Sequence, residues 1–348
     1  MIWLTWRQFR GAAVMTGSAL LVLAVALVAT GPGLASAYAR GIKTCGETND
    51  CGRFFDRFFD EYTTPFMAVT LAVLLLPALI GLFWGAPLIT RELETGTHLL
   101  VWNQTVTRGR WLTVKLTLLG VTATAAACVL GLAVTWWSDP LDKSAAPGYG
   151  LMDPLVFSGR GIAPMGYAVF AFALGVAVGM LVRRTLPAMA LTLALFAAVQ
   201  LLMPLVVRQH LIQPVSGTFE LSRENVDGFG IPRSGPPRVQ LNAAIPGHIG
   251  AWVLTSTLVD PSGKESPEGS VEVSTVTGPC SPAQMRPPDA SGKDPCMNEI
   301  NRLGYRQQAT YQPLDRFWPF QWIETGIYLV LTAALVGFCF WWTRRRLS

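Results

Sequence analysis

The sequence predicts an all-α polytopic membrane protein with six transmembrane helices and a small, loop-rich, partly β extracytoplasmic domain. Of its 348 residues, 51% are hydrophobic and only 14% are charged, whereas a soluble globular protein has about 25% charged residues. The apolar residues gather in six runs, each near the ~20 residues that cross a bilayer. A span must satisfy its own backbone, so each run is expected to be helical. The predicted spans are Ala12–Thr30, Phe66–Ile89, Leu112–Trp137, Ile162–Val182, Leu186–Val207 and Phe320–Trp342.

The distribution of Lys and Arg predicts the orientation, because basic residues favour the cytoplasmic ends of spans. One set of ends carries only two acids, Glu92 and Glu94. Its basic residues are Arg7, Arg10, Arg91, Arg108, Arg110, Lys115, Arg183, Arg184, Arg344, Arg345 and Arg346. We therefore expect a multi-pass protein of the cell (plasma) membrane with both termini in the cytoplasm. The net charge of +5 then reflects topology, and no nucleic-acid partner is expected.

The start of the chain allows two interpretations. Residues 1–10 mix Trp and Phe with Arg, which suits a short helix in the headgroup region or the basic flank of a signal anchor. Ala35-Ser36-Ala37 is similar to a signal-peptidase site. The apolar run before it is longer than the ~7–15 residues of a signal-peptide core, so we expect an uncleaved first span.

Several spans carry local signals. In the first outer loop, residues 31–65, aromatic side chains recur at helical spacing and predict an amphipathic helix: Phe54, Phe55, Phe58, Phe59 and Tyr62. The second span contains Gly81 and Gly85 together with Pro77 and Pro87, and its prolines predict a kink. In the fourth span, Gly175 and Gly179 form a small face that lets another helix approach closely.

The chain divides into three regions. Residues 1–207 hold spans one to five, residues 208–318 form the extracytoplasmic domain, and residues 319–348 hold the sixth span and a basic tail. Within the domain, alternating residues predict strands at 251–259 and 270–276.

Six cysteines support the predicted topology. Cys45 and Cys51 lie in the first outer loop, and Cys280 and Cys296 lie in the large one, so two disulfides are expected outside. Close spacing favours Cys45–Cys51 and Cys280–Cys296, although cross-pairing remains open. Cys128 and Cys339, in spans, are expected to be free, and no metal site is predicted because the three histidines lack ligand spacing.

Glu324 is an acid about one turn inside the sixth span. A charge at the bilayer centre costs about 2.5–3.5 kcal/mol on insertion scales, so Glu324 is expected to face protein or water. Two roles remain open: a place on a transport pathway, or an interfacial carboxylate that pairs with Arg316.

The stretch between the second and third spans, residues 91–111, is a polar hinge. Gly96 is expected to stop the incoming helix in a left-handed cap. His98 to Trp102 can form a short crosswise helix, and Thr107 can cap the helix that follows.

This hinge resembles the loop between the second and third spans of ATP-binding-cassette (ABC) exporter permeases of the ABCG-like type V class. That family has an Arg-Glu-x-Glu-x-Gly-Thr run, a Leu-rich turn, and a Ser/Thr-Arg pair with Lys seven residues after the Arg. The matching residues are Arg91, Glu92, Glu94, Gly96, Thr97, Thr107, Arg108 and Lys115. Thr105 stands where the family often has proline. The six-span layout also fits, but the large outer loop does not enter the resemblance.

The resemblance implies a membrane-spanning permease subunit of an ATP-driven exporter, similar to bacterial drug and lipid exporter permeases. It implies an N-terminal elbow helix and a cytoplasmic coupling helix in the hinge. It also implies a separate ATPase subunit, a second permease copy (identical or related) and membrane lipid as partners. The residues expected to couple to the ATPase are Arg91, Glu92, Glu94, Gly96, Thr97, Leu100 and Arg108.

The chain lacks a recognisable catalyst of its own. A phosphate-binding loop needs G-x-x-x-x-G-K-[ST], yet Gly263-Lys264 and Gly292-Lys293 are followed by acids. We therefore expect no enzyme and no cofactor in this chain, with ATP and Mg on the partner ATPase. The alternative is a membrane sensor or assembly protein with a ligand-binding outer domain. A membrane enzyme is disfavoured by the absence of intramembrane catalytic groups.

Overall fold

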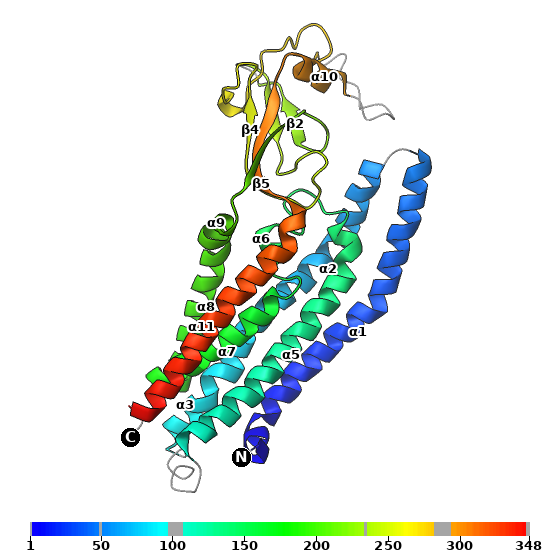
Figure 1. Cartoon of the computed structure of the whole chain (residues 1–348). Coiled ribbons are helices and arrows are strands. Elements are labelled where there is room, and N and C mark those ends of the chain that lie inside the picture. The colour runs from blue at the N-terminus through cyan, green and yellow to red at the C-terminus, as the bar shows by residue number, and fades with distance from the viewer. Residues whose placement is uncertain (1, 49–50, 97–106, 233–234, 282–293, 346–348) are drawn as a thin grey trace.

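A computed structural model describes residues 2–48, 51–96, 107–232, 235–281 and 294–345 (Figure 1). Long helices form a bundle, a small β region lies at one end of it, and both termini lie at the other end. Six helices among the described residues are long and apolar enough to cross a membrane, which confirms the predicted number of spans. They are Ala13–Gly46, Phe54–Glu94, Arg108–Asp142, Ala163–Val182, Thr185–Leu211 and Leu314–Arg345.

Each predicted span coincides with a helical segment, and several of these segments extend beyond the predicted bounds. The α-helices are α1 (Ile2–Thr48), α2 (Cys51–Ile80), α3 (Ala86–Glu94), α5 (Arg108–Asp142), α6 (Pro154–Phe157), α7 (Ala163–Val182), α8 (Thr185–Leu202), α9 (Gln209–Leu211), α10 (Pro295–Arg302) and α11 (Phe317–Arg345). Two π-helical turns, η1 (Gly81–Gly85) and η2 (Met203–Arg208), interrupt the second and fifth spans. Two 3₁₀ turns are η3 (Pro267–Gly269) and η4 (Leu314–Arg316).

The first outer segment, residues 31–65, is mostly helical: the amphipathic helix predicted at 54–62 is confirmed as the start of α2, and α1 extends beyond the predicted first span. Helix α1 continues through Pro32, and α2 begins at Cys51. The Tyr38 ring lies 5.6 Å from that of Phe58, and the Cys45–Cys51 disulfide joins the two helix ends. Aromatic packing and the cross-link therefore extend the helical pair beyond the apolar runs. Residues 2–10 belong to the same helix α1, and the elbow helix stays a prediction.

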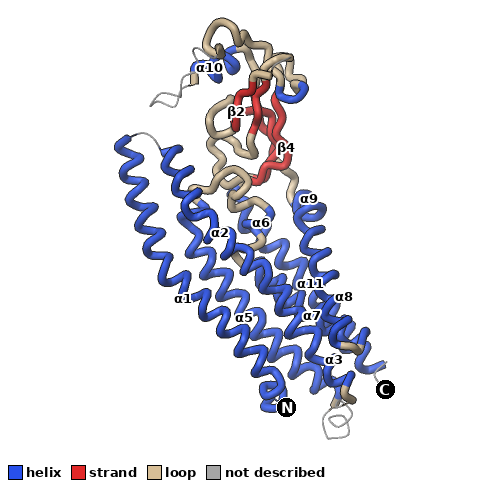
Figure 2. Tube along the Cα trace, turned by 180° about the vertical axis from the view of Figure 1, so that it is seen from behind, coloured by secondary structure: helices blue, strands red, loops and turns tan. Residues whose placement is uncertain are grey.

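Helix α7 is the centre of the bundle. It is apolar on all sides and nearly fully buried, as expected for a helix surrounded by other helices. It packs against α2, η1, α3, α5, α8 and α11. Helix α1, in contrast, lies at the edge of the bundle, where Figures 1 and 2 both place it beside α5.

The predicted close approach between helices occurs at α7. An added Cβ on Gly179 would lie 2.7 Å from the Ala86 carbonyl oxygen, and one on Gly85 would lie 2.5 Å from the Phe172 carbonyl oxygen. The second span is interrupted at the π-turn η1, where the predicted kink stays a prediction. Pro87 follows η1 by two residues and has no N–H to donate to the Phe83 carbonyl within it. Glycines on both helices thus let the backbones of η1 and α7 touch.

The β region contains two small antiparallel sheets (Figure 2). The strands are β1 (Val215–Phe219), β2 (Val226–Gly230), β3 (Arg238–Leu241), β4 (Trp252–Val259) and β5 (Arg306–Gln312). The orders are β1-β5-β4 and β2-β3. The strand predicted at 251–259 is confirmed as β4. The one predicted at 270–276 is wrong: only Ser270 forms an isolated bridge, to Arg238, because no neighbouring strand continues the pairing.

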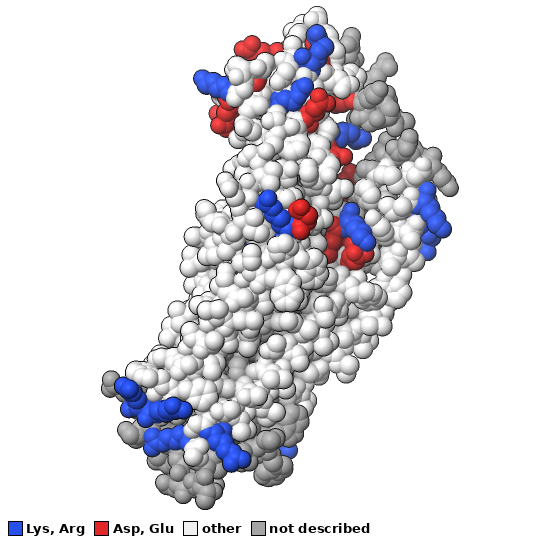
Figure 3. Space-filling model, in the orientation of Figure 1, with Lys and Arg blue, Asp and Glu red and all other residues white. Residues whose placement is uncertain are grey.

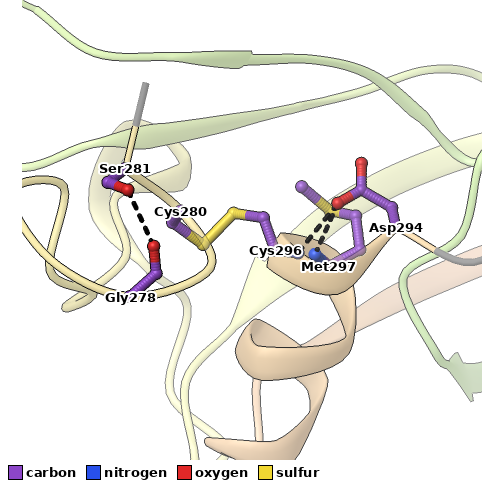
Figure 4. The surroundings of a disulfide bond; sticks show 6 residues. All are labelled: Gly278, Cys280, Ser281, Asp294, Cys296 and Met297. Atoms are coloured by element: carbon purple, nitrogen blue, oxygen red, sulfur yellow. Dashed lines mark hydrogen bonds between the residues drawn. A yellow bond between two sulfur atoms is a disulfide. The ribbon is translucent and has the colours of Figure 1, made fainter. Parts of the chain in front are cut away.

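The predicted disulfides are both confirmed, and Cys128 and Cys339 are free. Figure 4 shows the second, which joins Cys280 in a loop to Cys296 at the start of α10. The Asp294 side chain caps this helix by accepting hydrogen bonds from the backbone N–H groups of Cys296 (2.8 Å) and Met297 (3.2 Å). The Cys280–Cys296 disulfide and the Asp294 cap together hold α10 within the core of the β region.

Candidate functional site

The described parts of the predicted hinge, residues 91–96 and 107–111, lie at the end of α3 and the start of α5, at the end of the bundle that carries the termini (Figure 1). Gly96 adopts a φ of +70° and follows the last turn of α3, which confirms the predicted left-handed stop. The Thr107 hydroxyl accepts a hydrogen bond from the Arg110 N–H at 3.3 Å, which confirms the predicted cap of α5. Thr97, Leu100 and the expected short helix lie outside the described residues.

A buried ion pair joins the two helices that flank the hinge. The Lys115 ammonium lies 2.6 Å from a Glu92 carboxylate oxygen, and the two side chains are 4% and 8% exposed. The same ammonium lies 4.7 Å from the Trp111 ring centroid, within the range of a cation–π contact. Losing one partner of such a buried pair is far more costly than losing an exposed contact. Glu92 therefore holds α3 against α5.

Glu94 links the hinge to the fifth span. Its carboxylate accepts hydrogen bonds from the Thr185 hydroxyl (2.6 Å) and the Thr185 N–H (3.4 Å). It thereby caps the first turn of α8 with an acid, the sign that a helix N-terminus favours. Arg91 is exposed on α3, and Arg108 is half-buried at the start of α5. The hinge residues thus connect three helices and leave basic side chains at the surface.

The charges of the bundle are asymmetric. In Figure 3 the end that carries the hinge shows Lys and Arg but no Asp or Glu. Basic and acidic residues occur together at the opposite end and over the β region. The described acids at the hinge end are Glu92, which is buried, and Glu94, which binds Thr185. This asymmetry is the one that the sequence predicted from the loops.

A second cluster of charges is buried near the β region. Arg208, at the end of η2, binds Glu324 of α11 in bidentate fashion, with Nε–Oε2 at 2.7 Å and Nη2–Oε1 at 2.9 Å. The side chains are 1% and 0% exposed. The Tyr167 hydroxyl of α7 donates to Glu324 Oε1 at 2.5 Å. Bidentate geometry with further hydrogen bonds is what a buried pair needs to offset its desolvation.

The same arginine holds the short helix α6. Arg208 Nη2 donates to the Ser158 hydroxyl at 3.0 Å, and its guanidinium lies 4.1 Å from the Phe157 ring centroid. One turn earlier on α11, the Gln321 amide oxygen accepts from the Ala163 N–H at 2.7 Å at the start of α7. The cluster therefore ties together the ends of three spans and the segment that connects the third span to the fourth.

Sequence reasoning found Glu324 but missed its partner. Arg316, the partner considered from the sequence, instead donates to the Gln213 carbonyl and the Gln312 amide oxygen. The available signal was the position of Arg208 directly after an apolar run, which marks a charge close to the same membrane depth as Glu324.

A second buried arginine, Arg160, is held less completely. Its Nε lies 3.5 Å from Asp142 Oδ2, which also accepts from the Ser138 hydroxyl at 2.7 Å. Within the described residues, its Nη1 and Nη2 atoms have no hydrogen-bond partner. Burial lowers the pKa of Arg160, and the Asp142 carboxylate opposes this shift. Arg160 also lies over the Phe66 ring at 5.0 Å, so it joins the 143–162 segment to α2 and α5.

Comparison with known families decides what this bundle is. The model of the family described as ABC-2 membrane transporter related matches residues 17–208, which is 192 of the 348 residues. The chain belongs to the ABC-2 membrane transporter related family. No curated protein and no solved structure matches it.

Membership in the ABC-2 family agrees with the six apolar helices and makes the chain a multi-pass membrane permease component of an ABC transporter. Such components are typically not enzymes and work with an ABC ATPase. The ABC-2 match includes the hinge and ends at Arg208, so the β region and α11 lie outside it. Among the described residues, no group of three His, Cys, Asp or Glu side chains could hold a metal ion.

Proposed function

We propose that this chain is the membrane subunit of an ATP-driven exporter of the ABCG-like type V class, and that residues 91–111 receive movement from a separate ATPase. The observation that carries the proposal is the set of links around the hinge. Glu92–Lys115 joins α3 to α5, and Glu94–Thr185 joins the hinge to α8. A push on this surface would therefore act on three spans together.

The proposed route of movement continues through α7. The backbones of η1 and α7 touch at glycines, so a displacement of α3 cannot be absorbed by flexible side chains. π-turns often occur at functional sites within helices, and η1 lies between the hinge and the outer half of the second span. Closure of the ATPases on ATP and Mg would shift the equilibrium between two states of the bundle, provided that the hinge contacts differ between them.

In this proposal the functional unit contains two permease copies, identical or related, and two ATPases. The hinge end is cytoplasmic and the β region is extracytoplasmic. The Arg208–Glu324 cluster closes the outer ends of the fourth, fifth and sixth spans. A pathway role for Glu324 would require this cluster to separate during the transport cycle.

Substitutions in the hinge test the coupling. We expect Glu94→Ala and Arg108→Ala to leave chain abundance unchanged but to lower co-purification of the ATPase, or stimulated hydrolysis, by at least about ten-fold, since interfacial charge contacts each contribute a few kcal/mol. The partner ATPase is sought as a P-loop protein without spans of its own that a neighbouring gene encodes. Co-purification and hydrolysis in liposomes are the measurements.

Thr185→Val is the matched control for Glu94. It removes the hydroxyl bond to α8 but leaves the carboxylate in place. If Thr185→Val uncouples hydrolysis without weakening ATPase binding, Glu94 acts by moving α8. Normal binding and coupling in Glu94→Ala, Arg108→Ala and their double variant would remove the hinge from the mechanism.

Orientation is tested separately by cysteine labelling in a background without Cys128 and Cys339. We expect Cys introduced at Thr95 to be protected from an impermeant thiol reagent on intact cells, and Cys introduced at Val276, which is 87% exposed, to be labelled. The basis is the excess of Arg at the hinge end. Labelling at position 95 together with protection at position 276 would show the opposite orientation in the membrane.

A further inference from the structure

The C-terminal end of α11 has a groove on its outward face. Its volume is about 430 Å³, and it is lined by Gly337, Phe340, Trp341, Arg344 and Arg345. Four of these residues recur at i, i+4, i+7 and i+8, which places them on one face of the helix. Cys339 and Thr343, on the opposite face, are buried against the bundle. The groove therefore faces the surroundings of the bundle and not its interior.

The chemistry of the groove changes along the helix. Gly337 has no side chain and therefore leaves a low point in the helix surface, here called the notch; an added Cβ would meet no atom within 4 Å. Trp341 and Phe340 follow, and the Arg345 guanidinium lies 6.0 Å from the Trp341 ring centroid. Arg344 and Arg345 are exposed at the end. Aromatic rings prefer the boundary between hydrocarbon and headgroups, and arginines bind phosphate oxygens in a forked geometry.

We propose that this groove is a binding site for an anionic phospholipid of the leaflet at the hinge end of the bundle. The two arginines hold the headgroup phosphate, the aromatic rings lie beside the glycerol region, and an acyl chain packs along the Gly337 notch. Charge complementarity identifies the occupant. The lining includes two arginines and no acid, so a zwitterionic lipid gains less than one with net negative charge.

A lipid at this place would fix the outward face of α11 relative to the membrane surface. α11 carries Glu324 and packs along α7. The position of α11 therefore affects the Arg208–Glu324 ion pair. The inference depends on the family's membrane location and on the described geometry. It does not depend on the coupling mechanism proposed for the hinge.

The test is native mass spectrometry of the full chain in detergent, titrated with phosphatidylglycerol or phosphatidylcholine. Each arginine near an anionic surface contributes about five-fold in affinity, so Arg344→Gln with Arg345→Gln should weaken phosphatidylglycerol retention about 25-fold. The double variant Arg183→Gln with Arg184→Gln, at the same end of the bundle but outside the groove, should retain the lipid like the unaltered chain.

A second variant tests the shape of the groove independently of its arginines. Gly337→Leu fills the notch from a position with open space around it, so it should leave folding intact and still reduce retention. Glycerol phosphate at matched concentration should not compete, because it lacks the acyl chains. Equal retention of phosphatidylcholine and phosphatidylglycerol, or unchanged retention in both groove variants, would overturn the site. ATPase is absent throughout, so such a failure leaves the hinge proposal standing.

Discussion

Glu324→Ala should destabilise the bundle by about 3–5 kcal/mol, the cost of leaving one partner of a buried ion pair uncompensated. Removing Glu324 would leave the Arg208 guanidinium, 1% exposed, without its carboxylate. It would also remove the acceptor of the Tyr167 hydroxyl. Thermal unfolding of the purified chain in detergent measures the effect as a lowered Tm and a loss of monodisperse protein.

The surface pair Arg238–Glu268 provides the control. Its side chains are 47% and 69% exposed, and exposed pairs contribute little. Glu268→Gln should therefore leave Tm unchanged. The double variant Arg208→Met with Glu324→Leu should be less destabilised than the sum of the two single variants, because it leaves no buried charge. Additive single effects would show that the two side chains do not act as a pair.

Gly175→Ala should also be strongly destabilising, although alanine is ordinarily the better helix former. The new methyl group would lie 2.7 Å from the Ala86 nitrogen and closer still to the Gly81 carbonyl oxygen. These are backbone atoms, so relief requires α7 and η1 to separate. Overpacking of this kind costs about 1–3 kcal/mol. The measurement is again Tm in detergent, together with the yield of folded protein.

Gly326→Ala is a matched control, because it makes the same change in α11 where an added Cβ meets nothing within 4 Å. It should be neutral or slightly stabilising. If Gly175→Ala behaves like Gly326→Ala, the contact between η1 and α7 is not tight, and the proposed route from the hinge to α7 loses its support.

The spans and the disulfides could be predicted because each depends on a local property. Run length and the need to satisfy the backbone determine the helices, and the close spacing of the cysteines in the loops favours the observed cross-links. Gly96 and Thr107 were predictable for the same reason, since stops and caps are short-range features. The amphipathic helix at residues 54–62 was predictable from its aromatic spacing, but the continuation of α1 to Thr48 was not, because Tyr38 packs on Phe58 of another helix.

The charged cluster illustrates what sequence alone does not contain. Glu324 stands out as an acid in an apolar run, but its partner depends on which spans lie side by side. The nearest arginine in sequence, Arg316, was a reasonable candidate and is occupied elsewhere. The strand expected at 270–276 failed similarly: alternation indicates a surface that fits a sheet, and a partner strand must still be present.

The separation of Arg208 and Glu324 along the chain has a consequence for biogenesis. The two residues are 116 positions apart, and ribosomes add about 5–20 residues per second. Arg208 therefore leaves the ribosome about 6–23 s before the carboxylate that will neutralise it. During that interval the fifth span must keep its guanidinium in water or among headgroups, because a lone charge in hydrocarbon is too costly. The Arg208–Glu324 pair can form only after α11 has been synthesised, so the order of translation delays closure of this end of the bundle.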